Sequence, residues 1–205
     1  PLAVTWEDEL KELIFDEDEE ILDGEHLITL KTPYRAADAA IVPISLDFKN
    51  KQDENNFVKK VTIIVDENPS PIVGQIHMTP KTGNPSFSTR IRIDRYTYVR
   101  AIAEMNDEKK YMVANYVKAA GGCSAPSLAD MDTVMARLGK MKMKFIETSN
   151  NPDVINKAKF LISHPNFSGL QFNQLTRAEI PADFVNLIKI EQDGNMILKA
   201  SPDIS

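Results

Sequence analysis

The chain has 205 residues, of which 42% are hydrophobic and 26% charged, so it holds enough apolar material for one or two cores. Its formal net charge of -6 and its pI near 5.2 argue against a nucleic-acid binder, which would present a basic face. The sequence also lacks an apolar run long enough for a transmembrane helix. The chain begins at Pro1 without a recognisable signal, and we expect that a targeting segment was removed or that the chain was trimmed.

Residues 1 to about 25 are expected to form a helix with an acidic tail. Thr5 stands at a capping position, and Asp8 three residues later completes a capping-box pattern. Apolar side chains follow at helical spacing, at Trp6, Leu10, Leu13 and Ile14. The acidic run 16–20 predicts a solvated turn, with a metal or partner site as the alternative.

From about residue 27 to 120 the hydrophobic period changes to two. Apolar residues alternate with polar ones in the ranges 42–48, 91–94 and 99–105, residues 61–65 are a continuous apolar run, and residues 111–117 make a last strand. Clusters of Asn, Asp, Gly, Pro and Ser separate these runs. Six or seven short strands at this spacing predict an all-β sandwich.

The stretch that follows, 118–126, contains the single cysteine, Cys123. Gly121 and Gly122 precede it and remove the Cβ restriction on the backbone, so we expect the thiol to lie on a flexible, exposed arm. A thiolate in such a place is a nucleophile, and Lys118 could favour its formation. The alternative is a buried, inert cysteine that acts as a small hydrophobic residue.

Residues 127–139 predict a short helical linker, with Ser127 as its cap and an apolar face of Leu128, Met131, Met135 and Leu138. A second β pattern starts at Lys140, and Asp193-Gly194 predicts a hairpin near its end. This pattern supplies only four or five strands. We therefore expect a domain that is cut short or that another chain completes through an open sheet edge.

Catalytic machinery is sparse in this sequence. His26, His77 and His164 are scattered without metal-ligand spacing, and no phosphate loop or nucleophile elbow is present. Four arginines gather at Arg90, Arg92, Arg95 and Arg100, where an anion site competes with a solvated strand face. These features predict a protein that is not an enzyme and that needs no metal or cofactor.

Several motifs, in the right order, resemble the fused SoxY–SoxZ proteins of sulfur oxidation. The SoxY-like part carries an Asn-Pro-Ser-Pro turn at 68–71, two strands at 89–93 and 99–105, and the Gly121-Gly122-Cys123 carrier motif. The SoxZ-like part carries the motifs at 164–169 and 180–185. The chain is thus similar to SoxYZ-like carrier proteins of the type associated with quinoprotein dehydrogenases. It departs from SoxY in that the motif is internal, Ser124 replaces a glycine and Pro126 follows.

The resemblance implies two immunoglobulin-like β-sandwiches, at 1–126 and 140–205, joined by the linker 127–139. It also implies a periplasmic carrier in which Cys123 holds a sulfur-containing intermediate, as in thiosulfate oxidation, with Gly121 and Gly122 as the hinge. Expected partners are periplasmic sulfur-oxidation enzymes or a quinoprotein dehydrogenase system, with neither nucleic acid nor membrane. A homodimer could form through Cys123 or through open sheet edges. The alternative is a non-catalytic adaptor for a quinoprotein dehydrogenase, with Cys123 vestigial or in an intermolecular disulfide.

Overall fold

The computed structural model of the protein describes residues 5–126 and 130–204. The chain divides into two units, one made of Pro1–Ala125 and Asn186–Ser205 and the other of Pro126–Val185. The predicted all-β class is confirmed, with short helices only near the N-terminus, after Met78 and after Asp130 within the described part of the chain.

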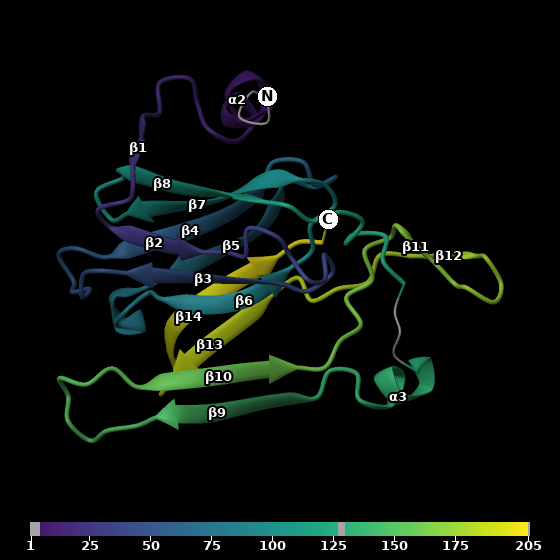
Figure 1. Cartoon of the computed structure of the whole chain (residues 1–205). Coiled ribbons are helices and arrows are strands. Elements are labelled where there is room, and N and C mark those ends of the chain that lie inside the picture. The colour runs from purple at the N-terminus through teal and green to yellow at the C-terminus, as the bar shows by residue number, and fades with distance from the viewer. Residues whose placement is uncertain (1–4, 127–129, 205) are drawn as a thin grey trace. The chain divides into compact units, whose positions relative to one another are not determined.

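A seven-stranded sheet is the larger layer of the first unit. Its strands lie in the order β1-β8-β7-β4-β5-β14-β13 (Figure 1). Their bounds are β1 Ile21–Asp23, β4 Val58–Val65, β5 Ile72–Met78, β7 Thr97–Met105, β8 Lys110–Val117, β13 Ile188–Gln192 and β14 Asn195–Pro202. All neighbours pair antiparallel except β1, which runs parallel to β8.

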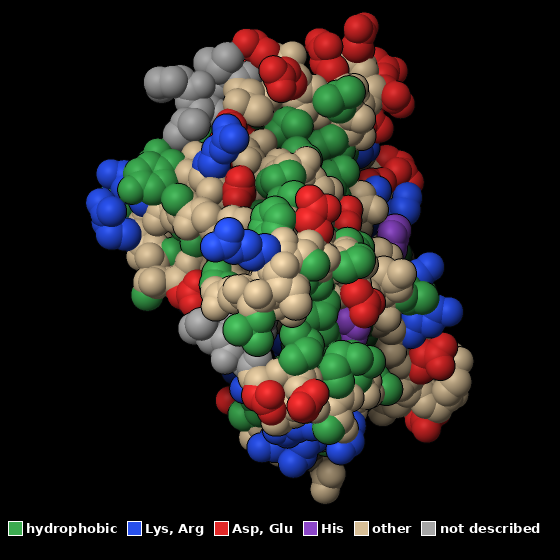
Figure 2. Space-filling view, turned by 90° about the vertical axis from the view of Figure 1, so that its right-hand side faces the viewer, with side chains coloured by type: hydrophobic (Ala, Val, Ile, Leu, Met, Phe, Trp, Pro, Cys, Tyr) green, Lys and Arg blue, Asp and Glu red, His purple; other side chains and the backbone are tan. Residues whose placement is uncertain are grey.

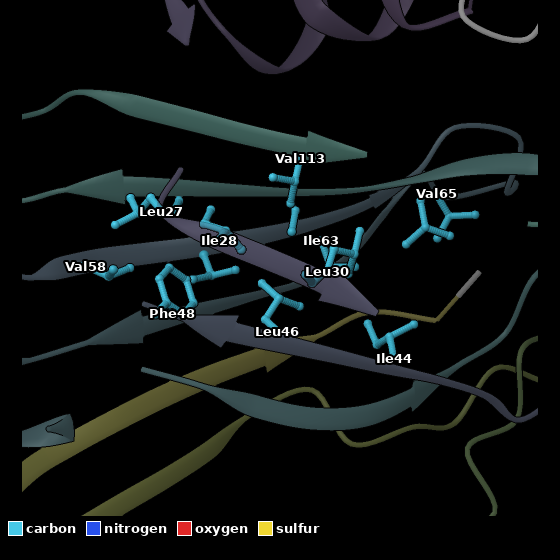
Figure 3. Packing of buried hydrophobic residues seen from close by; sticks show 14 of the residues in the cluster. Leu27, Ile28, Leu30, Ile44, Leu46, Phe48, Val58, Ile63, Val65 and Val113 are labelled. Atoms are coloured by element: carbon cyan, nitrogen blue, oxygen red, sulfur yellow. The ribbon is translucent and has the colours of Figure 1, made fainter. Parts of the chain in front are cut away.

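The second layer is a three-stranded antiparallel sheet in the order β2-β3-β6, formed by β2 Ile28–Lys31, β3 Val42–Phe48 and β6 Phe87–Ile91. The alternation predicted for 42–48 is confirmed, because β3 buries every second side chain. Figure 3 shows these side chains meeting those of the larger sheet. The shared core includes Ile44 and Leu46 from β3 and Val61 and Ile63 from β4, so this unit is the predicted sandwich.

The N-terminal helix is shorter than predicted and covers the outer face of the large sheet. It consists of a π-helical turn, η1 Trp6–Leu10, and α2 Lys11–Ile14. Trp6 and Leu10 pack on Ile64 and Ile102, whereas Leu13 is 81% exposed. The predicted Thr5 cap is wrong, because the Thr5 hydroxyl donates instead to Glu67 Oε1 at 2.6 Å.

The acidic run after this helix is the solvated turn that the sequence predicted, since its side chains are exposed apart from the half-buried Glu19. Glu19 Oε1 forms an ion pair with Lys110 Nζ at 3.3 Å. In Figure 2, acidic side chains gather at the top of the drawn face. No set of three or more potential metal-binding side chains occurs among the residues that the structure describes.

A buried ion pair fixes the end of β4 to the middle of β7. Arg100 Nη2 and Asp66 Oδ2 lie 2.8 Å apart, and their side chains are 6% and 0% exposed. Burial raises the pKa of Asp66, and the hydrogen bonds from Arg100 act against that rise. The guanidinium also lies over the Trp6 ring, 4.8 Å from its centroid. The solvated face considered for the arginines is therefore wrong for Arg100.

The C-terminal hairpin joins the first unit rather than a separate sandwich. The predicted Asp-Gly turn at 193–194 is confirmed between β13 and β14. However, β14 pairs with β5, so that Leu198 faces Met78 and Ala200 faces Ile76. The hydroxyls of Thr79 and Thr82, at the short helix η2 Pro80–Thr82, also bond Ile197 O. This placement differs from the expected domain at 140–205, because the edge of β5 offers the hairpin a backbone partner.

The described residues of the second unit form two separate strand pairs and one short helix. The helix α3 Met131–Ala136 is capped by Asp130, which accepts from Thr133 N at 3.1 Å. The predicted cap Ser127 and the residue Leu128 lie outside the described residues. The strands are β9 Met141–Glu147 paired with β10 Lys157–Ile162, and β11 Gln171–Phe172 paired with β12 Glu179–Ile180.

The apolar side chains of β9 are exposed in the structure, which differs from the half-buried strand expected there. Met141 is 68% and Phe145 69% exposed. The two motifs at 164–169 and 180–185 lie against each other, because Phe167 and Asp183 exchange two backbone hydrogen bonds of 2.8 and 3.0 Å. The described residues of this unit therefore form two separate strand pairs.

No helix in the described part of the chain is long and apolar enough to cross a membrane.

Arg100→Met tests the buried ion pair, because it leaves the Asp66 carboxylate buried without its partner. We expect the free energy of unfolding to fall by about 3–5 kcal/mol. Urea denaturation followed by circular dichroism measures this loss. Lys31→Met is the control, since Lys31 pairs with Asp47 at 3.0 Å with side chains 67% and 51% exposed, and a surface pair contributes at most about 1 kcal/mol. Equal losses in both variants would contradict the assignment.

Candidate functional site

The segment that leaves β8 is held against the residues that follow β6. Gly121 N donates to Asp94 O at 2.8 Å, and Gly122 N donates to Ile93 O at 2.9 Å. Gly121 has a φ of 79°, a conformation that L side chains rarely adopt. The two glycines therefore anchor the loop as well as turn it.

Gly122 is required by a close approach of backbone to backbone. A Cβ added here would overlap the carbonyl oxygen of Ala39 and come within 2.6 Å of Ile93 O. Ala39 O is itself an acceptor for Ile93 N at 2.9 Å. Three segments thus meet at this glycine, and only a residue without a side chain fits between them. The resemblance implied a hinge at this position, and in this conformation its backbone is tightly packed.

Cys123 is buried, with 0% of its surface exposed. The prediction of an exposed thiol on a free arm is therefore wrong for this conformation. The physical reason lies in the backbone, because hydrogen bonds to residues 93 and 94 draw the loop onto the sandwich. Two glycines permit a flexible arm, but they also permit this tight packing, and the sequence does not distinguish the two.

Arg92 and Asn68 complete the support of the thiol loop. Arg92 Nη1 donates to Gly122 O at 2.9 Å, directly before the cysteine. Asn68, from the Asn-Pro-Ser-Pro turn, is 5% exposed. Its Nδ2 donates to Arg92 O and its Oδ1 accepts from Asp94 N, both at 2.9 Å. One carboxamide therefore fixes the segment on which the loop rests.

The guanidinium of Arg92 is also the positive charge beside the thiol. Burial lowers the pKa of Arg92, whereas the charges of Cys123 and Asp38 raise it. A positive charge therefore lies near a sulfur that is buried in this conformation.

The other candidate residues lie apart from this loop or serve the fold. Arg90 and Arg95 are exposed, and Arg100 belongs to the buried ion pair. Lys118, considered as a charge near the thiol, lies over the Tyr34 ring at 4.9 Å. The anion site considered for the arginine group is thus not assembled, and Arg92 alone among the four bonds the thiol loop in the described residues.

The three histidines have separate surroundings. His26 packs edge-on against Tyr111, with ring centroids 5.3 Å apart. His77 lies on β5, where its pKa is lowered mainly by burial and further by the charges of Lys60 and Lys199. His164 Nδ1 accepts from Asn166 N at 3.0 Å and orders the loop before β11.

Sequence reasoning missed two residues of the site. Asn68 was recognised only as part of a turn motif, and Asp38 was not singled out. The Asn-Pro signal at 68–69 could have indicated a structural carboxamide, because Asn side chains commonly bond nearby backbone groups in turns. Its actual partners are 24 and 26 residues away, which no local pattern reveals.

Gly122→Ala tests whether close packing at this glycine keeps the thiol covered. We expect a loss of about 1–3 kcal/mol in the free energy of unfolding, as for other overpacked sites, together with faster alkylation of Cys123 by iodoacetamide. Gly121→Ala is the matched control, since a Cβ there meets nothing within 4 Å. It should lose stability through its positive φ while the thiol stays covered. Equal alkylation rates in the two variants would contradict the packing role.

Comparison with known proteins agrees with the resemblance in the sequence. Residues 12–123 match the family profile "Sulfur oxidation protein SoxY", and residues 143–205 match "Sulphur oxidation protein SoxZ". The first match covers more than half of the chain and ends at the cysteine itself. No curated protein matches the sequence.

Solved structures that resemble the chain include two kinds of protein. The sulfur carrier protein SoxY from Chlorobium limicola f. thiosulfatophilum is 21% identical, with a TM-score of 0.44, and the match covers 57% of this chain and 96% of that one. A superoxide reductase (neelaredoxin) from Ignicoccus hospitalis is 11% identical, with a TM-score of 0.41, over 45% of this chain and 80% of that one. By its profile matches, the chain belongs to the SoxY family of sulfur oxidation proteins and carries a SoxZ-type segment in the same polypeptide.

Proposed function

We propose that the protein is a carrier that holds a sulfur-containing intermediate covalently on Cys123 and presents it to partner enzymes. The observation that carries this proposal is the Gly-Gly-Cys sequence at the end of the SoxY match. The thiol lies in the loop that follows β8, with Arg92 bonded to the residue before it. A single nucleophilic sulfur on a rigid body is what a covalent carrier needs.

The chemistry of loading follows from the thiol. Joining a cysteine thiol to thiosulfate through a sulfur–sulfur bond releases one proton and two electrons, which the loading enzyme must accept. The carrier itself supplies only the sulfur atom that forms the new bond. Thiosulfate is accordingly the proposed cargo, and a sulfur-oxidation enzyme the proposed loading partner.

The internal position of the motif sets the geometry of delivery. The loop around Cys123 continues into the chain on both sides, with Ser124 and Pro126 after the cysteine. A loop tethered at both ends has a shorter reach than a free terminus. Partner enzymes must therefore approach the body of the sandwich closely to reach the sulfur.

The periplasm is the proposed compartment, and a quinoprotein dehydrogenase system is a further proposed partner. Both follow from the resemblance to SoxYZ-like proteins. Neither homodimerisation through Cys123 nor pairing through a sheet edge is needed for this carrier role. The edge strands of the large sheet are β1 and β13.

A second function is favoured by one observation, the complete burial of Cys123. A thiol that never opens to solvent would make the protein a non-catalytic adaptor, with the sandwich as a docking body and the cysteine as a core residue. The two functions differ in whether Cys123 is ever modified in the cell.

Intact mass spectrometry of protein from its native source tests the carrier function. We expect a sulfur-containing adduct that peptide mapping assigns to Cys123 and that a reducing agent removes. Cys123→Ser should lose the adduct and the activity of the sulfur-oxidising system, while circular dichroism shows that the variant is folded. An unmodified thiol, together with full activity of Cys123→Ser, would rule out the carrier and leave the adaptor.

A further inference from the structure

We propose that Arg92 is a positioning residue that latches the thiol loop shut, and that Cys123 reacts only when this latch opens. The inference rests on the proposed function, since it describes how the same sulfur is regulated. A carrier thiol must be reached by other molecules, yet Cys123 is 0% exposed.

Among the described residues, hydrogen bonds of two kinds hold the loop in its closed position. Two of them join backbone groups, from Gly121 N to Asp94 O and from Gly122 N to Ile93 O. Another comes from a side chain, Arg92 Nη1 to Gly122 O at 2.9 Å. A charged donor makes this bond stronger than a bond between neutral groups. It acts on the peptide group that directly precedes the cysteine.

Arg92 is suited to this role because its own backbone is fixed. Asn68 bonds Arg92 O and Asp94 N, so that the residues carrying the latch are braced at both ends. Ile93 N is held in addition by Ala39 O. Movement is therefore concentrated in the loop, and opening has to break the bond between Arg92 and Gly122 together with the two backbone bonds.

Gly122 makes the closed position sharply defined. Its backbone lies so close to Ala39 and Ile93 that a side chain does not fit. Packed contacts of this kind have discrete states rather than a continuous range. The loop thus closes fully, with the sulfur buried, or leaves the contact, with the sulfur accessible. A docking enzyme that accepts the Arg92 guanidinium would shift this equilibrium toward the open state.

Alkylation kinetics test the latch without any cargo or partner. In the full-length wild-type chain, the rate of Cys123 alkylation should level off as iodoacetamide is raised, because opening becomes limiting. Arg92→Gln should raise this limiting rate about tenfold or more, as expected for the loss of a charge-assisted hydrogen bond. Arg92→Lys keeps the charge with fewer donors and should restore part of the wild-type behaviour.

Arg90→Gln is the matched control, since Arg90 is an exposed arginine on β6, two residues away. It should leave the limiting rate unchanged, and unfolding midpoints should confirm that all variants are folded. Alkylation of the wild type that rises linearly to the rate of the urea-denatured chain would overturn the latch. So would equal limiting rates for wild type and Arg92→Gln. An unmodified thiol in native protein would contradict the carrier function and leave the latch standing.

Discussion

The carboxamide of Asn68 is the contact on which the candidate site depends. It spans the backbone between Arg92 and Asp94 and thereby fixes the segment that receives Gly121 and Gly122. Without it, Arg92 and Asp94 would lose the two side-chain bonds that brace them, and the bond from Ile93 N to Ala39 O would remain. The thiol loop rests on this segment, so its closed state rests on one buried side chain of a turn.

The same turn also links the site to the rest of the sandwich. Asp66, two residues before Asn68, forms the buried ion pair with Arg100. Glu67 accepts a hydrogen bond from the hydroxyl of Thr5. The outer helix is attached through Trp6, which packs against the Arg100 guanidinium. Three consecutive polar residues thus connect the helix, the large sheet and the thiol loop. Asp66 and Asn68 can be buried in the structure because each polar side chain has a partner of its own.

Local patterns were sufficient to predict several strands and one hairpin of the fold. Alternation in 42–48 and 99–105 and the Asp-Gly turn at 193–194 correspond to strands and a hairpin that the structure contains. The Gly-Gly-Cys sequence located the site because a single cysteine and a family motif coincide there. In each case the signal and its consequence lie within a few residues of each other.

Long-range pairing could not be predicted in this way. That β14 adds to β5 depends on which sheet edge is open, and period-two patterns carry no information about the partner strand. The burial of Cys123 depends on the approach of Ala39 and Ile93, and the ion pair depends on Arg100 meeting Asp66. Flexibility and close packing both favour glycine. For that reason Gly121-Gly122 suggested a free arm where the structure has a closed loop.

The central claim is that the thiol loop is closed at rest, and amide hydrogen exchange at Gly121 and Gly122 tests it most directly. Both amides donate to residues 93 and 94, so they should exchange at least about tenfold more slowly than an unprotected peptide, in proportion to the population of the open state. Exchange of both amides at the rate of an unstructured peptide would contradict the account, because the loop would then be the free arm that its glycines suggest.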